Sequence, residues 1–247
     1  MHGLPDAIRG CLFDLDGVLT QTAKVHDAAW TEMFNTFLSE WSRATSTEFV
    51  PFDPVQDYEQ YIDGKPRLAG TRSFLASRGI TLPEGQEGDP PGAHTINGLG
   101  NRKNQVFLAK VRSERVEVYQ GSVRYVHAAK EAGLRRAVVS SSANTRAILA
   151  AAHIEDLFEA RIDGIVAQRE HLHGKPAPDT FLAGARALGL QPGAAAVFED
   201  ALAGVAAGRA GQFGYVVGVD RLGQADALRE HGADVVVRDL SELLEQQ

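Results

Sequence analysis

Residues 8–18 read IRGCLFDLDGV, an apolar run that ends in two aspartates and a glycine. Short apolar runs bounded by turn residues are typical of buried β-strands. We therefore predict a buried strand over 8–13 that delivers an acidic loop beginning at Asp14. The single cysteine, Cys11, lies inside this run, and we expect it to be a buried apolar residue without a disulfide partner.

The second half of the chain repeats a strand-and-helix pattern. After about residue 120, helical patterns alternate with short runs of β-branched and apolar residues at 138–139, 162–166, 194–198, 215–219 and 235–237. This alternation is typical of βαβ units, whose strands pair in parallel and are covered by helices. The fold class we predict is α/β, with a Rossmann-like parallel sheet as the core.

The segment between the first strand and this pattern differs in character. It contains helical candidates at 26–42, 52–62, 66–79 and 101–113, with no convincing β-branched run. We interpret residues 22–116 as a helical cap domain inserted after the first strand. Residues 1–21 and 117–247 then form the core domain, and the proline- and glycine-rich stretch 82–94 is a loop inside the cap.

Charge and hydropathy narrow the class of protein. The chain of 247 residues has a formal charge of −7, which argues against binding to a phosphate backbone, since such binding needs a basic face. No window approaches a run of about 18 apolar residues, and the N-terminus lacks a basic region followed by an apolar stretch. We expect a cytoplasmic monomer that binds neither nucleic acid nor membrane.

Polar side chains follow the predicted strands, at the edge where ligands bind in open parallel sheets. They are Asp14 and Asp16, then Ser140, Ser141, Ser142 and Asn144, then Lys175, and finally Glu199 and Asp200. Carboxylates from two strand ends repel one another unless a hard cation such as Mg²⁺ lies between them. Ser140 and Lys175 offer a hydroxyl and a positive charge to phosphate oxygens. The set predicts a metal-assisted phosphate site.

Each of these motifs has a simpler interpretation. Asp-x-Asp-Gly after a strand is an ordinary turn, and a serine run can cap a helix. Lys175 could be a solvated side chain, while Glu199 and Asp200 could be acids at a helix N-terminus. The occurrence of all four motifs at successive strand ends favours the metal and phosphate site.

Together, DLDGV at 14–18, VVS at 138–140, GKPAPD at 174–179 and FED at 198–200 resemble the haloacid dehalogenase superfamily. Within it, the chain is most similar to the β-phosphoglucomutase-like subfamily, over essentially its whole length. The resemblance implies a magnesium-dependent phosphotransferase that acts on sugar phosphates through an aspartyl phosphate. It implies a mutase that converts β-glucose 1-phosphate to glucose 6-phosphate.

The resemblance also implies roles for individual residues of the core. Asp14 is the nucleophile and Asp16 the general acid and base. Mg²⁺ is held by Asp14, the backbone carbonyl of Asp16, Glu199 and Asp200. The phosphoryl group is bound by Ser140, Ser141 and Lys175.

In the cap, the resemblance implies that the sugar phosphate meets His26, Trp30, Gly64, Arg67 and Lys103, with Ser142 and Asn144 contributed by the core. Two positions depart from the subfamily pattern: Ala143 replaces a lysine after Ser142, and Gln21 replaces an aspartate. The lost lysine removes a phosphate-binding charge, which Arg146 could supply.

Two other functions stay open. A sugar-phosphate phosphatase shares every core residue and differs in letting water reach the aspartyl phosphate. A noncatalytic binding domain is the third alternative. The intact set of Asp14, Asp16, Ser140, Lys175 and Asp200 argues against it.

Overall fold

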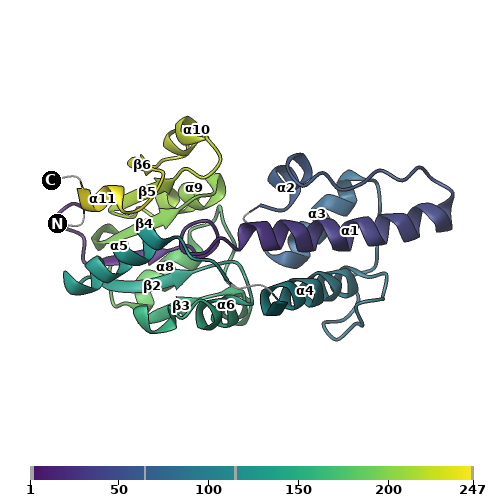
Figure 1. Ribbon diagram of the computed structural model, residues 1–247, viewed down its shortest axis with the longest axis horizontal. Coiled ribbons are helices and arrows are strands. Elements are labelled where there is room, and N and C mark those ends of the chain that lie inside the picture. Colours follow the sequence, from purple (N-terminus) through teal and green to yellow (C-terminus); the bar gives the residue numbers. More distant parts are fainter. Residues whose placement is uncertain (1–2, 64, 114–115, 246–247) are drawn as a thin grey trace. The chain divides into compact units, whose positions relative to one another are not determined.

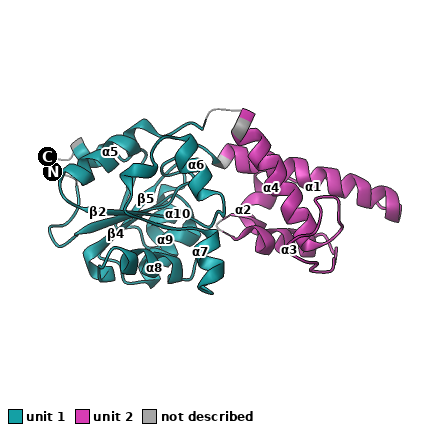
Figure 2. Ribbon diagram, turned by 90° about the horizontal axis from the view of Figure 1, so that it is seen from below, with its two compact units in different colours: residues 1–22, 116–247 teal, residues 23–115 magenta. Residues whose placement is uncertain are grey.

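The structure is a computed structural model that describes residues 3–63, 65–113 and 116–245. The chain divides into two compact units, shown in different colours in Figure 2. Residues 1–22 and 116–247 form one unit, called here the sheet unit, and residues 23–115 form the helical unit. Among the described helices, none combines the length and the hydropathy that a membrane-spanning segment needs.

The sheet unit contains six parallel strands. They are β1 (Gly10–Phe13), β2 (Arg135–Val139), β3 (Ala160–Ile162), β4 (Ala195–Glu199), β5 (Tyr215–Val219) and β6 (Val235–Val237). Their order in the sheet is β3-β2-β1-β4-β5-β6, so β1 lies between β2 and β4. This topology confirms the predicted α/β fold with a parallel, Rossmann-like sheet.

Helices cover both faces of the sheet. They are α5 (Gln120–Glu131), α6 (Thr145–Ala151), α7 (Gly164–Arg169), α8 (Asp179–Ala187), α9 (Leu202–Ala210), α10 (Ala225–Glu230) and α11 (Glu242–Glu245), with short 3₁₀ turns at Glu155–Leu157 and Pro192–Ala194. Figure 2 shows the sheet nearly edge-on, with α5 and α6 on one side and α8 and α9 on the other. Both faces of β1 are therefore buried, as its apolar sequence requires.

Alternate residues of β1 serve the two faces. Leu12 packs into the apolar cluster under α8 and α9. Phe13 stacks on Phe198 with ring centroids 4.5 Å apart and meets the ring of Tyr125 edge-on. Cys11 is buried as predicted, and burial raises the pKa of its thiol, which keeps it neutral. The strand is thus held by packing on both sides, and its end is a rigid platform.

One predicted strand was partly wrong. We predicted a strand over 162–166, but β3 ends at Ile162 and α7 begins at Gly164. The carboxylate of Asp163 accepts hydrogen bonds from the amides of Ile165 and Val166, at 3.1 and 2.9 Å. This N-cap starts a helix despite the β-branched side chains, and Ile165 is left exposed.

The helical unit is built from α1 (Ala23–Thr45), α2 (Gln56–Tyr61), α3 (Arg67–Ser77) and α4 (Ile96–Ser113). Figure 1 shows α1 as the longest of these helices, with α4 beside it. Helix α4 begins earlier than the predicted residue 101, because the hydroxyl of Thr95 accepts the amide of Gly98 and caps it (2.9 Å).

Aromatic side chains form the core of the helical unit. Phe34 lies at its centre, with ring centroids 4.2 Å from Phe74, 5.2 Å from Phe52 and 5.2 Å from Trp30. All four side chains are buried. The unit therefore has a hydrophobic core of its own.

We predict that Phe34→Ala lowers the free energy of unfolding by about 3–5 kcal/mol, because it leaves a cavity among these rings. The control is Phe49→Ala, whose side chain is 45% exposed and whose loss should cost less than about 0.5 kcal/mol. Both tryptophans of the chain lie in this unit, so urea denaturation followed by tryptophan fluorescence reports on it. Equal losses in the two variants would contradict the assignment of Phe34 to the core.

Candidate active site

The carboxyl end of β1 delivers Asp14 to the middle of the sheet edge. The amide of Asp14 donates to the carbonyl of Phe198 (2.9 Å), so the pairing of β1 with β4 continues beyond Phe13. This register brings Asp14 beside Glu199, the last residue of β4. Their side chains are buried, with 6% of Asp14 and 1% of Glu199 exposed.

The loop after Asp14 is a tight turn that fixes the second aspartate. Gly17 has a φ of +85°, and its amide donates to the carbonyl of Thr20 (2.8 Å). The hydroxyl of Thr22 donates to Oδ1 of Asp16 and lies 2.6 Å from the hydroxyl of Thr20. The carboxylate of Asp16 is therefore oriented by its own loop.

Lys175 is shared by the two buried carboxylates. Its Nζ donates to Oδ1 of Asp14 and to Oε2 of Glu199, each at 2.5 Å. Burial lowers the pKa of Lys175, but the charges of Asp14 and Glu199 outweigh burial and raise this pKa above its usual value. The ammonium group therefore stays charged and is part of the cluster.

Three carboxylates meet at this edge of the sheet. Asp14, Glu199 and Asp200 each offer an oxygen, and these oxygens lie within 4.8 Å of one another. The ammonium group of Lys175 contacts two of them, Asp14 and Glu199, and its single charge leaves the cluster formally negative. Hard divalent cations take carboxylate oxygens as ligands. The donor set therefore fits a divalent metal ion.

Two glycines make room for the acidic side chains. A methyl group on Gly17 would lie 1.8 Å from Oδ2 of Asp200, and one on Gly204 would lie 2.1 Å from the carboxyl carbon of Glu199. Only a hydrogen fits at either position. The conformations of both carboxylates thus depend on backbone approaching without a side chain.

The loop after β2 presents serines at the neighbouring strand end. Ser140 is buried, its amide donates to the carbonyl of Ile162 (2.9 Å), and its hydroxyl accepts the amide of Ser142 (3.1 Å). The carbonyl of Ser142 accepts the amide of Gly164 (3.1 Å), while the hydroxyl of Ser142 accepts the amide of Asn144 (3.2 Å). A methyl group on Gly164 would lie 2.8 Å from the carbonyl oxygen of Ser141. The loop is therefore fixed by backbone contacts.

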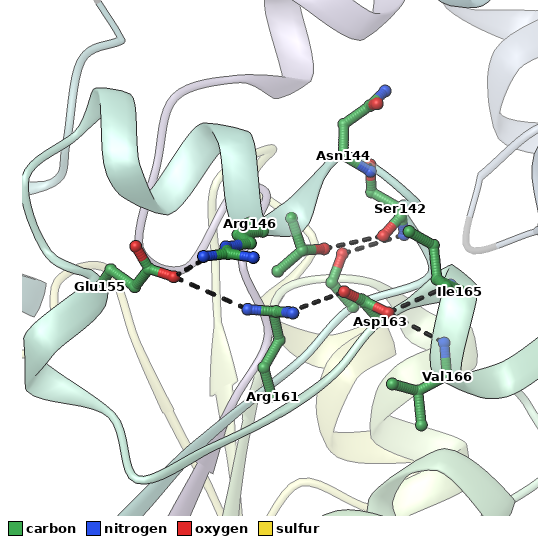
Figure 3. Close-up of polar contacts among 10 residues, drawn as sticks. Ser142, Asn144, Arg146, Glu155, Arg161, Asp163, Ile165 and Val166 are labelled. Atoms are coloured by element: carbon green, nitrogen blue, oxygen red, sulfur yellow. Dashed lines mark hydrogen bonds and ion pairs between the residues drawn. The ribbon is translucent and has the colours of Figure 1, made fainter.

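Arg146, the candidate replacement for the missing lysine, is engaged elsewhere. Its Nε lies 3.4 Å from Oε1 of Glu155, and its side chain is 75% exposed. Figure 3 shows Arg146 and Arg161 both pointing toward Glu155, with Arg161 also paired to Asp163 (2.7 Å). Ala143 is thus not compensated by Arg146 in this arrangement.

The helical unit gathers basic groups of its own. Nζ of Lys103 donates to Nδ1 of His26 (2.6 Å), and the His26 ring stacks on Phe107. Burial, then the charges of Lys103 and Arg67, hold the pKa of His26 well below its usual range. Burial also lowers the pKa of Arg67, and its Nε lacks a hydrogen-bond partner among the described residues. This set, called the basic cluster, comprises His26, Arg67 and Lys103.

Trp30 and Gly64 are the other two predicted substrate-binding residues of this unit. Trp30 is 3% exposed and belongs to the aromatic core, where its ring also lies 5.1 Å from Nζ of Lys103. Gly64 lies outside the described residues. Asp27, the neighbour of His26 in the chain, is half-buried, and burial with the charge of Asp63 raises the pKa of its carboxyl group to about 6.

Sequence reasoning missed the supports of the acidic loop. Thr22 bonds to Asp16 from six residues away, and a pattern search for charged strand ends gives it no weight. The loop after β5 was also passed over, although Arg221 and Gln224 follow a strand end in the same sheet. Applying the strand-end rule to every strand would have found them.

Comparison with known proteins gives a family match and full-length relatives. The family model described as haloacid dehalogenase-like hydrolase matches residues 8–212. A β-phosphoglucomutase of Mycobacterium bovis is 56% identical over 245 residues, which cover 98% of this chain and 94% of the relative. A β-phosphoglucomutase of Bacillus subtilis is 32% identical over 241 residues, covering 96% and 92%.

A solved structure shares the fold. The β-phosphoglucomutase of Clostridium difficile superposes with a TM-score of 0.77 at 22% identity, covering 96% of this chain and 93% of that one. This likeness extends over both units of the chain.

We predict that Gly17→Ala weakens binding of a divalent cation by about 10-fold or more, because the new methyl group displaces Asp200. Gly133→Ala is the matched control: Gly133 has a similar φ of +75° but no atom within 4 Å of the added methyl group. Both variants should lose about 1–2 kcal/mol of stability from backbone strain. Only Gly17→Ala should lose affinity in an electron paramagnetic resonance titration with Mn²⁺, and equal affinities would refute the close approach.

Proposed function

The chain belongs to the haloacid dehalogenase-like hydrolase family, and from this membership and the site geometry we propose that it is a magnesium-dependent β-phosphoglucomutase. It interconverts β-glucose 1-phosphate and glucose 6-phosphate through an aspartyl phosphate on Asp14. The observation that carries the proposal is the Asp14 carboxylate, buried against Lys175 and next to a second carboxylate on the neighbouring strand. The 56% identity to the mycobacterial mutase supports the choice of substrate.

In the first half of the reaction, an oxygen of Asp14 attacks the phosphorus of the substrate. The bond from phosphorus to the sugar oxygen breaks, and Asp16 gives its proton to that leaving oxygen. In the second half, Asp16 takes the proton from the other sugar hydroxyl, which attacks the aspartyl phosphate. The hydrogen bond from Thr22 supports this role because it holds the Asp16 carboxyl in one orientation.

Charge neutralisation falls to the residues around Asp14. We assign Ser140 and Lys175 to the oxygens of the transferring phosphoryl group, with Ser141 contributing from the same loop. Since the nucleophile and the phosphoryl group are both negative, the positive charge of Lys175 lowers their repulsion at the point of attack. Its burial makes that contribution larger than it would be in water.

The carboxylate cluster fits Mg²⁺. We assign Asp14, Glu199, Asp200 and the backbone carbonyl of Asp16 as its protein ligands. When bound, Mg²⁺ supplies the positive charge that lets a nucleophilic carboxylate and a phosphate approach each other.

The basic cluster supports a mutase because a bisphosphate intermediate carries a second, nonreacting phosphate. Arg67 can grip two oxygens of that phosphate with its planar guanidinium, and Lys103 adds a second charge. His26, Ser142 and Asn144 complete the proposed set of substrate contacts, to which Gly64 and Trp30 also belong by resemblance. Retention of the bisphosphate is what separates phosphate transfer from hydrolysis.

A sugar-phosphate phosphatase is the second candidate, and one observation favours it. The loop after Ser142 carries Ala143 instead of a cation, and Arg146 pairs with Glu155. Weaker retention of the second phosphate would let water reach the aspartyl phosphate. The cytoplasmic location and the monomeric state expected from sequence stay predictions under either function.

An assay of product identity separates the two functions. With β-glucose 1-phosphate, Mg²⁺ and catalytic glucose 1,6-bisphosphate, we expect glucose 6-phosphate to accumulate well ahead of free phosphate. Stoichiometric release of phosphate would establish the phosphatase instead.

Asp14→Asn should abolish turnover, and Asp16→Asn should slow it by about 10²–10⁴-fold because proton transfer is lost. Near-normal activity of Asp14→Asn would overturn both candidates.

Arg67→Ala tests the basic cluster. We expect mutase kcat/KM to fall by about 10²-fold, or about 2.7 kcal/mol of transition-state stabilisation, because the nonreacting phosphate loses its bidentate partner. Hydrolysis of acetyl phosphate, which has no second phosphate, should stay within about twofold. Arg72→Ala is the control on the same helix, since Arg72 is exposed and paired with Glu84 (2.8 Å). A parallel loss of both activities would mean that Arg67 supports the fold and not the substrate.

A further inference from the structure

The loop between β5 and α10, residues 220–224, contributes no proposed ligand, yet it contacts both loops that carry the metal ligands. Nε of Arg221 donates to the carbonyl oxygen of Gly17 (2.7 Å). Nε2 of Gln224 donates to the carbonyl oxygen of Asp200 (3.2 Å). The amide of Gln224 in turn donates to Oδ1 of Asp220 (2.8 Å), which fixes the end of the loop. One short segment therefore spans the two acidic loops.

The guanidinium of Arg221 is held in place from three directions. Besides Gly17, it donates through Nη1 to the carbonyl of Arg238 (2.6 Å). Its carbon atom lies 3.5 Å from the centre of the Tyr119 ring, a cation–π contact. The amide of Tyr119 donates to the carbonyl of Leu19 (3.0 Å), so this aromatic platform is tied to the nucleophile loop as well.

The backbone of Gly17, whose carbonyl group accepts from Arg221, lies against the side chain of Asp200. Gly17 approaches the Asp200 carboxylate so closely that a methyl group would lie 1.8 Å from Oδ2. Movement of the Gly17 peptide therefore changes the position available to the Asp200 side chain. Hydrogen bonds that stop this movement keep Asp14 and Asp200 at a fixed spacing.

We propose that Arg221 and Gln224 are positioning residues that hold the Asp14–Gly17 loop and the Asp200 loop at the spacing a divalent cation requires. The inference rests on the proposed function, since it assumes that the carboxylate cluster binds a metal ion. Because Arg221 is positively charged, the direction of the change in metal affinity on its removal tests the proposal. Removing a cation from the neighbourhood of carboxylates strengthens metal binding if charge alone matters, whereas loss of positioning weakens it.

The experiment measures Mn²⁺ binding to the whole protein by electron paramagnetic resonance, without sugar phosphate, followed by competition with Mg²⁺. Arg221→Ala should weaken binding by about 10–100-fold, the range found when groups that orient metal ligands are removed. Arg221→Lys should weaken it by at least about threefold, because an ammonium group cannot make both hydrogen bonds and the stacking contact. Gln224→Ala should also weaken binding, to a smaller extent.

Arg229→Ala is the matched control, because it removes the same charge from helix α10 while Arg229 is exposed and paired with Asp226 (2.8 Å). It should leave the affinity within about twofold. In steady-state assays, the Arg221 variants should need more Mg²⁺ for half-saturation and recover most of kcat at saturating Mg²⁺. A purely structural role would lower stability and leave both readouts unchanged.

If Arg221→Ala does not fold, Arg221→Lys and Gln224→Ala decide the question. Affinity that is unchanged or increased in these folded variants overturns the inference and leaves the proposed function intact. Absence of Mn²⁺ binding in the parent protein would instead contradict the metal site itself, and with it the proposed function.

Discussion

The structure depends on the burial of one ammonium group between two carboxylates. Asp14 and Glu199 come from adjacent strands and have lost nearly all contact with water, a state that isolated carboxylates do not tolerate. Lys175, in the chain segment before α8, donates a hydrogen bond to each of them. Removal of Lys175 would leave both buried carboxylates without a compensating charge, which costs far more than the ion pairs contribute. The sheet edge is therefore organised around charge balance.

The charges do not balance fully, since Asp200 and Asp16 add further negative charge next to the same loop. Close backbone approach and a local hydrogen bond accommodate these two carboxylates. Gly17 lets the loop approach Asp200 without a side chain, and Thr22 occupies an oxygen of Asp16. The serine loop after β2 is held in the same way, by amides and carbonyls that include Gly164. A site of this kind is preorganised before any ligand arrives.

The strands and their polar ends could be predicted because short segments of sequence determine which strands are buried and where turns form. The apolar residues before Asp14 and the β-branched run of β5 leave few alternatives to a parallel sheet. Where two local signals conflicted, the stronger capping interaction prevailed, as when Asp163 turned the predicted strand at Ile165 into helix α7. Contacts between residues distant in sequence could not be predicted, because nothing in the spacing of Arg221 and Gly17 indicates that this side chain meets that backbone carbonyl. The roles assigned to the site residues stay predictions.

The central place of β1 in the sheet also bears on how the chain folds. In the sequence, its partners β2 and β4 follow the entire helical unit. Pairing of 10–13 with 135–139 therefore closes a very long loop. Such closure loses much chain entropy before any contact compensates for it, and it is slow compared with local helix packing. The helical unit has an aromatic core of its own, built from helices close together in sequence, so it can form early. Its formation shortens the flexible chain between β1 and β2. We therefore expect the carboxylate cluster to be among the last features to form during refolding, which would make metal uptake a reporter of the completed native topology.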